Sequence, residues 1–149
     1  MSTLGKPRFS PSAWEDKKDA GCYPYAMNWH HRNEWLLIGD IIGKRMEGYH
    51  TDEELIATLK EELEFLGYSV KDSTFDEEKS NHTKIYLMRA YFSGRYHLFR
   101  EDQDGWSHKY PGSLPINLDF FGEILWNPDE IDKKEYYGWF FLIGKKAGP

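Results

Sequence analysis

The chain has 149 residues, a length that favours one domain with a single core. Its 19 basic and 25 acidic residues give a net charge of −6, which argues against a nucleic-acid partner because phosphates bind to a basic surface. No apolar run approaches the roughly 20 residues that cross a bilayer, and the N-terminus lacks the apolar centre of a signal peptide. A single cysteine cannot form an internal disulfide. We therefore expect a cytoplasmic protein with neither a nucleic-acid nor a membrane partner.

Residues 1–20 are polar and contain two prolines, which predicts an extended N-terminal arm ahead of a single domain over residues 21–149. Phe9 and Trp14 are the side chains in this arm that are suited to anchor it to the body of the protein.

The only cysteine, Cys22, lies at the predicted start of a helix. Proline is favoured in the first turn of a helix, so Pro24 predicts a helix that begins at about Cys22 or Tyr23. Free N–H groups and the helix dipole stabilise an anion at that position, which lowers the pKa of a thiol from its usual value of about 8.5. The same N–H groups are suited to bind the oxyanion that forms when the sulfur attacks a carbonyl. The alternative is that Cys22 is a small buried apolar side chain.

His30 and His31 do not predict a metal site. Neighbouring side chains on a helix point about 100° apart, and no cysteine or carboxylate follows at ligand spacing. Beyond them, the apolar run 35–38 predicts a short buried element after a loop. We expect neither a metal ion nor another cofactor.

The segment from Thr51 to Gly67 has the clearest helical pattern. Thr51 and Glu54 match a capping box, and Gly67 supplies a C-terminal stop. Its leucines and isoleucine recur on one stripe, which we expect to pack against a sheet. Its many glutamates are typical of a solvated face.

The second half of the chain is rich in β-strand patterns. A short strand is predicted at 68–70 and a polar helix-like segment at 128–135. Two tight turns connect three consecutive antiparallel strands, of which the first is expected to be central. A continuous apolar strand near the C-terminus is expected to be buried. These four strands are predicted at 84–92, 95–101, 106–109 and 138–143.

The hairpin over residues 96–112 carries two histidines. Side chains alternate across a strand, so a pairing of Glu101 with Trp106 makes His97 and His108 diagonal neighbours on one face. The second imidazole is then placed to orient the first. The alternative is that each histidine is an ordinary half-buried aromatic residue. In the extended segment that follows, Asn117 or Asp119 is also suited to hold a histidine by its second ring nitrogen.

Four motifs follow one another along the chain: Cys22-Tyr23-Pro24-Tyr25-Ala26, His97-Leu98-Phe99-Arg100, Asp104-Gly105-Trp106-Ser107-His108-Lys109-Tyr110-Pro111-Gly112 and Asn117-Leu118-Asp119. These motifs are similar to those of a family of small bacterial and phage proteins. Their order resembles the papain-like cysteine hydrolases, including the cell-wall amidases of the NlpC/P60 type. In that superfamily a cysteine at a helix N-terminus precedes an antiparallel sheet that carries a histidine and then a polar orienting residue.

The resemblance implies an α+β, papain-like fold in which N-terminal helices pack on an antiparallel sheet. It implies a cysteine peptidase, amidase or transferase in which Cys22 is the nucleophile and His97 the base, with His108, Asn117 or Asp119 as the orienting residue. The substrate would be a peptide, a protein or a cell-wall peptide, which is cleaved through a thioester. We expect four aromatic side chains to contact the substrate: Tyr23, Tyr25, Trp29 and Trp106.

Two further functions are compatible with the sequence. One is a non-catalytic binding module of phage or bacterial origin, which uses an acidic surface with exposed Tyr23, Tyr25 and Trp29 to bind or inhibit a protein partner. The other is a metal site formed by His97 and His108.

Overall fold

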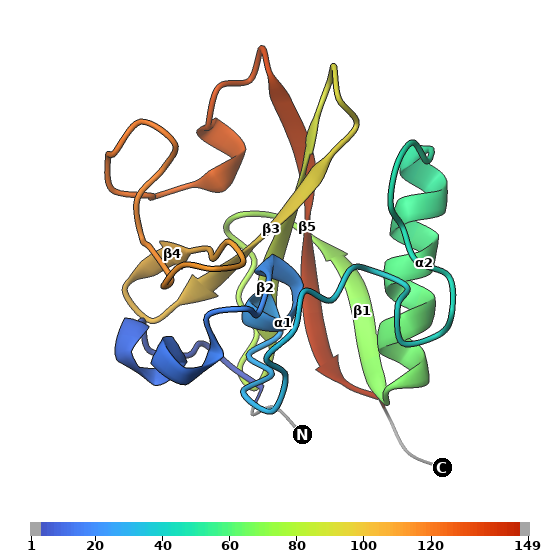
Figure 1. Cartoon of the computed structure of the whole chain (residues 1–149), viewed down its shortest axis with the longest axis horizontal. Helices are drawn as coiled ribbons and strands as arrows, with labels where there is room; N and C mark the ends of the chain where they lie inside the picture. The colour runs from blue at the N-terminus through green and yellow to red at the C-terminus, as the bar shows by residue number, and fades with distance from the viewer. Residues whose placement is uncertain (1–3, 147–149) are drawn as a thin grey trace.

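The computed structural model describes residues 4–146 and shows an α+β fold built on a five-stranded antiparallel sheet (Figure 1). The strands lie in the order β1-β5-β2-β3-β4, so the C-terminal strand inserts between the first two. Their bounds are Tyr68–Ser73 for β1, Thr83–Ala90 for β2, Tyr96–Asp102 for β3, Gly105–Ser107 for β4 and Tyr136–Lys145 for β5. The position of β2 confirms the predicted central strand.

Both faces of the sheet are covered, and β2 shows this most clearly. Its side chains alternate between two apolar clusters: Ile85 and Leu87 face the first, and Tyr86 and Met88 face the second. The helices α1 (Cys22–Ala26) and α2 (Asp52–Phe65) belong to the first cluster. In Figure 1, α2 lies beside β1 and α1 lies in front of the sheet. This double burial explains why β2 is a nearly continuous apolar run.

Helix α2 begins as the sequence predicts. The Thr51 side chain accepts a hydrogen bond from the Glu54 N–H, and the Glu54 side chain accepts one from the Thr51 N–H, which completes the capping box. Leu55, Leu59 and Leu63 are buried against the sheet.

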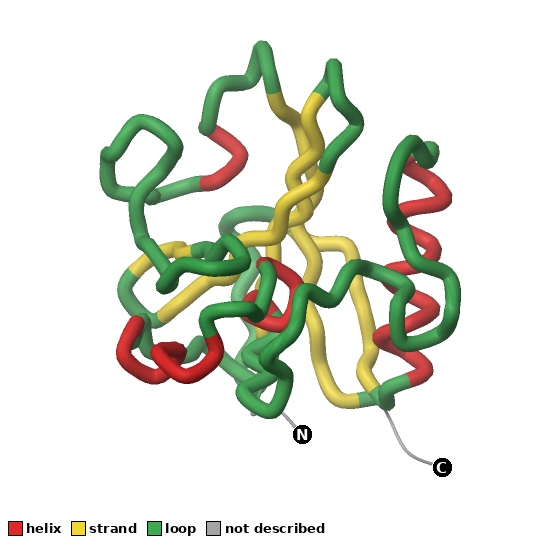
Figure 2. Tube along the Cα trace, in the orientation of Figure 1, coloured by secondary structure: helices red, strands yellow, loops and turns green. Residues whose placement is uncertain are grey.

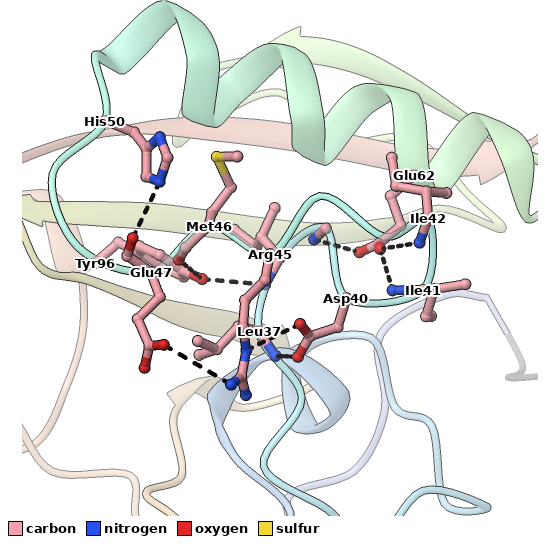
Figure 3. A network of polar contacts seen from close by, with 12 residues as sticks. Leu37, Asp40, Ile41, Ile42, Arg45, Met46, Glu47, His50, Glu62 and Tyr96 are labelled. Carbon is pink, nitrogen blue, oxygen red and sulfur yellow. Dashed lines mark hydrogen bonds and ion pairs between the residues drawn. The ribbon is translucent and has the colours of Figure 1, made fainter.

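One glutamate of α2 contradicts the prediction of a solvated face. The Glu62 side chain is fully buried and accepts hydrogen bonds from the backbone N–H groups of Gly39 (3.0 Å), Ile41 (2.8 Å) and Ile42 (3.3 Å) (Figure 3). It also accepts one from the Tyr23 hydroxyl (2.6 Å). A carboxylate can be buried here because four donors replace its water shell. Glu62 therefore attaches the loop 36–46 to the helix.

The sequence predicted an extended N-terminal arm, but part of this arm is helical. Residues Pro11–Lys17 form a 3-10 helix, η1, which buries Trp14 against Tyr25 at a ring-centroid distance of 5.1 Å. This burial confirms Trp14 as an anchor.

Two further element boundaries differ from the prediction. Strand β1 continues to Ser73 because it pairs with β5 as far as Phe140. The helix-like segment at 128–135 contains only a short 3-10 helix, η2, over Pro128–Glu130, which is capped by the Asn127 side chain. Figure 2 shows that the rest of the chain between β4 and β5 consists mainly of loops and turns.

Candidate active site

Helix α1 begins at Cys22, as predicted, and Gly21 is its N-cap. A buried polar network fixes this helix to the hairpin of β3 and β4. Arg100 on β3 pairs with Asp102 (2.7 Å) and lies over the ring of Tyr25 at 3.9 Å. Ser107 on β4 donates to Asp102 and bonds the Tyr25 hydroxyl (2.6 Å). The positions of α1 and the hairpin are therefore coupled.

His97 and His108 are in direct contact. The predicted pairing of Glu101 with Trp106 is present, and it places His97 Nε2 2.9 Å from His108 Nδ1. His108 Nε2 in turn lies 2.8 Å from the carbonyl oxygen of Leu118. The two histidines are diagonal neighbours on one face of the hairpin, as the alternation of side chains predicts.

These contacts fix the tautomers of both rings. A carbonyl oxygen only accepts, so His108 carries its proton on Nε2 and uses Nδ1 to accept a hydrogen bond from His97 Nε2–H. A neutral His97 then has its lone pair on Nδ1. Burial lowers the pKa of His97 well below its ordinary value, and the neighbouring His108 adds to this effect. Burial also lowers the pKa of His108, against the influence of the Leu118 carbonyl and Asp119.

The Cys22 thiol lies at the edge of β3, beside the backbone of the residue that follows His97. The pairing of β4 with β3 stops at Arg100, so β4 does not extend to Leu98. The backbone groups of Leu98 and, at the start of α1, of Cys22 and Tyr23 lie close enough to the sulfur to lower the pKa of the thiol. The fold thus brings Cys22 to the backbone of the histidine-bearing strand.

The predicted lowering of the Cys22 pKa is wrong. Burial raises the pKa of the thiol to about 11, and the three backbone N–H groups only partly offset this. Helix α1 has just five residues, so its dipole is small. At neutral pH the sulfur therefore keeps its proton.

Tyr110 packs against the histidine pair. Its ring stacks on His97 at 4.7 Å and 19°, while the side chain remains 42% exposed. Burial raises the pKa of Tyr110, and the charges of Tyr136 and Cys22 add to the rise. Tyr110 thus lies near the sulfur and next to the imidazole.

The other two candidates for the orienting residue lie elsewhere. The side chain of Asn117 is exposed, and within residues 4–146 it makes no hydrogen bond to a histidine. Asp119 accepts hydrogen bonds from the N–H groups of Phe121 (2.8 Å) and Glu123 (3.0 Å), which closes a local turn. The second ring nitrogen of His108 contacts the peptide carbonyl of Leu118.

The four aromatic side chains expected to contact a substrate are buried. Tyr23, Tyr25, Trp29 and Trp106 are at most 3% exposed. The prediction that Tyr23, Tyr25 and Trp29 are exposed is wrong, because each of the four side chains fills a core and all but Trp106 make polar contacts there. The aromatic anchors proposed for a binding module are among them.

Lys109 is a functional candidate that the sequence reasoning missed. It is fully buried, and its ammonium donates hydrogen bonds to the carbonyls of Lys18 (2.7 Å), Ala20 and Tyr110 (3.2 Å). Lys109 thereby ties the segment that enters α1 to the end of the hairpin. Lys109 directly follows His108 in a predicted strand. Because side chains alternate along a strand, this order places Lys109 on the opposite face from His108.

Within residues 4–146, no group of three or more His, Cys, Asp or Glu side chains is arranged to hold a metal ion. None of the helices in this range is both long and apolar enough to cross a membrane. Comparisons of the chain with protein-family models, with curated proteins and with solved structures find no match.

Proposed function

We propose that the protein is a cysteine hydrolase or acyltransferase of papain-like arrangement, with Cys22 as nucleophile, His97 as general base and His108 as the orienting residue. The observation that carries this proposal is the hydrogen-bonded series from the Leu118 carbonyl through His108 to His97. It holds the base in one tautomer while the only thiol of the chain lies at the adjacent Leu98 backbone.

In the first half of the reaction, His97 Nδ1 accepts the thiol proton as the sulfur attacks an amide or ester carbonyl. A C–S bond forms, the tetrahedral oxyanion collapses, and the C–N or C–O bond breaks as the leaving group takes the proton from His97. In the second half, His97 removes a proton from water or another acceptor, which attacks the thioester. The acyl group leaves Cys22, and the thiol is restored with the proton from His97.

The electrostatics favour general-base catalysis over a preformed ion pair. A thiol pKa of about 11 and a lowered imidazole pKa keep both groups neutral at pH 7. Proton transfer therefore accompanies attack. Because only neutral His97 can act as a base, reactivity is expected to persist at pH 7 and to fall on the acid side, below the ordinary histidine pKa of about 6.5.

A peptide or protein, including a cell-wall peptide, is the substrate class that we propose. Exposed apolar side chains occur in the loop after the hairpin, among them Phe121 and Trp126, which are 70% and 68% exposed. This loop also supplies the Leu118 carbonyl to His108. Apolar peptide side chains are suited to such a surface.

Alkylation of the single cysteine by iodoacetamide tests the proposal. At pH 7 the folded protein is expected to react at Cys22 about 100-fold faster than the His97→Ala variant, which lacks the base. The His31→Ala variant, whose side chain is exposed on a separate loop, is expected to match the wild type. Slow labelling of the folded wild type, unchanged by His97→Ala, would overturn the proposed function.

A further inference from the structure

A groove of about 460 Å³ lies where the N-terminus of α2, the turn between β2 and β3 and the start of β5 meet at one end of the molecule (Figure 1). None of the residues that line it belongs to the candidate active site, so the groove is a separate feature of the surface. Six of its side chains are aromatic or acidic: Tyr49, Asp52, Glu53, Tyr91, Phe92 and Tyr137.

Three aromatic rings of this groove are exposed to solvent although the fold does not need them there. Phe92 is 88% exposed, Tyr49 83% and Tyr91 57%. Tyr91 and Phe92 lie in the turn between β2 and β3, where polar residues would serve the backbone equally well. A single exposed apolar side chain is ordinary, but several that line one groove are typical of a binding surface.

Two of the rings are held in place from the start of α2. The Tyr137 hydroxyl donates a hydrogen bond to Asp52 Oδ1 (2.9 Å). Tyr91 packs on Tyr137, with the ring centroids 4.5 Å apart and the ring planes at 36°. This wall of the groove therefore exists before a ligand binds, which reduces the entropy that binding costs.

The cation of the groove, Arg89, is already paired with protein groups. It is only 3% exposed, and its guanidinium forms an ion pair with Asp52 (2.7 Å) and donates hydrogen bonds to the carbonyls of Gly94 (2.9 Å) and His50. The guanidinium also lies 5.9 Å from the centre of the Tyr49 ring. Arg89 thus balances the charge of Asp52 and forms part of the wall.

The charge that remains in the groove is negative. With Arg89 paired to Asp52, the exposed carboxylate of Glu53 is left, and within residues 4–146 it makes no ion pair. An anion would be repelled by this carboxylate, and three acidic side chains in the first turn of α2 already offset the positive end of its dipole. A cation would instead find a negative charge beside several aromatic rings, which attract cations.

We propose that this groove binds an arginine or lysine side chain of a basic peptide or protein partner. The cation lies against the rings of Tyr91 and Phe92 and pairs with the carboxylate of Glu53. The net charge of −6 attracts the same partner from a distance. The inference does not depend on the chemistry of Cys22, because the groove shares no residue with that site.

Fluorescence anisotropy with two labelled peptides tests the charge of the ligand. In the first peptide arginine alternates with glycine. In the second, citrulline replaces each arginine, which keeps the shape of the side chain and removes its charge. The protein is expected to bind the arginine peptide at least about 10-fold more tightly than the citrulline peptide. Equal affinities, or no binding of the arginine peptide, would overturn the inference.

Two charge-reversal variants locate the peptide on the surface. Glu53→Lys and Glu64→Lys change the net charge equally at exposed positions of α2, but only Glu53 lines the groove. We expect Glu53→Lys to weaken binding of the arginine peptide about 10-fold and Glu64→Lys to weaken it less than about 3-fold. Equal losses would show that the peptide responds to the net charge alone, which contradicts a site in the groove.

Leucine substitutions test the aromatic rings, because they keep an apolar side chain. Tyr91→Leu and Phe92→Leu are each expected to weaken binding of the arginine peptide about 5-fold to 10-fold. Phe121→Leu, which changes an exposed ring outside the groove, is expected to bind as the wild type. Phe92 is the more exposed of the two groove residues, so its variant decides the outcome if Tyr91→Leu unfolds. Wild-type affinity in the folded groove variants, or an equal loss in Phe121→Leu, would count against the site.

Discussion

At the scale of single residues, the candidate site depends on the direction of one hydrogen bond. His108 Nδ1 accepts a hydrogen bond from His97 Nε2–H only because His108 Nε2 donates its own hydrogen bond to the Leu118 carbonyl. A side chain that cannot accept at this position would leave His97 free to adopt the other tautomer, with its lone pair on Nε2 instead of Nδ1.

The His108→Phe variant tests this contribution while keeping an aromatic ring in the pocket. We expect it to slow alkylation of Cys22 at pH 7 by at least about 10-fold, since a base in the wrong tautomer loses most of its effect. Asn117→Ala, which removes an exposed side chain, is the control and is expected to react as the wild type. Loss in Asn117→Ala without loss in His108→Phe would reverse the assignment of the orienting residue.

At the scale of elements, the buried carboxylate of Glu62 connects α2 with the loop that carries Trp35 and with Tyr23 of α1. The neighbouring Glu61 makes an exposed ion pair with Lys44 (2.8 Å). Adjacent residues of the same type thus have different environments, because their side chains point about 100° apart on the helix, and only one of the two directions faces the core.

The Glu62→Leu variant is expected to lower the free energy of unfolding by about 3 kcal/mol or more, because it leaves buried donors without an acceptor. Glu61→Ala is expected to change it by less than about 0.5 kcal/mol, as is usual for an exposed ion pair. Urea titrations of the two variants give both values. Equal midpoints for the two variants would show that the Glu62 contacts contribute little.

At the scale of the whole molecule, the histidine pair links stability to pH. Burial lowers the pKa of both His97 and His108 in the folded state, whereas the unfolded chain binds protons near the ordinary value of about 6.5. Below that pH the unfolded state therefore holds more protons than the folded state. Stability is fully present above about pH 6.5 and is lost as the pH falls below it.

Thermal unfolding between pH 7.5 and pH 5 measures this linkage. We expect the melting temperature to fall below about pH 6.5, with a loss of at most about 1.4 kcal/mol per pH unit for each histidine. His97→Phe should show a shallower dependence, while His31→Gln, in which an exposed side chain is changed, should keep the wild-type slope. A His97→Phe profile parallel to that of the wild type would contradict the linkage.

The features that the sequence predicted are those set by neighbouring residues. The capping box of α2, the start of α1 at Cys22 and the pairing of Glu101 with Trp106 all follow from local spacing, turn chemistry and the alternation of side chains. The contact between His97 and His108 follows from the same register. The sequence of one hairpin is therefore enough to predict that these two residues are diagonal neighbours.

Only the tertiary structure decided how these residues behave. The high pKa of the Cys22 thiol, the burial of Glu62 and the selection of His108 by the Leu118 carbonyl depend on groups that are distant in the chain or in a loop without a regular pattern. The apolar run 35–38 predicts that Trp35 is a core residue, yet its side chain is 54% exposed. Desolvation and hydrogen-bond partners are properties of the packed molecule, whereas residue periodicity reports only which face of an element is apolar.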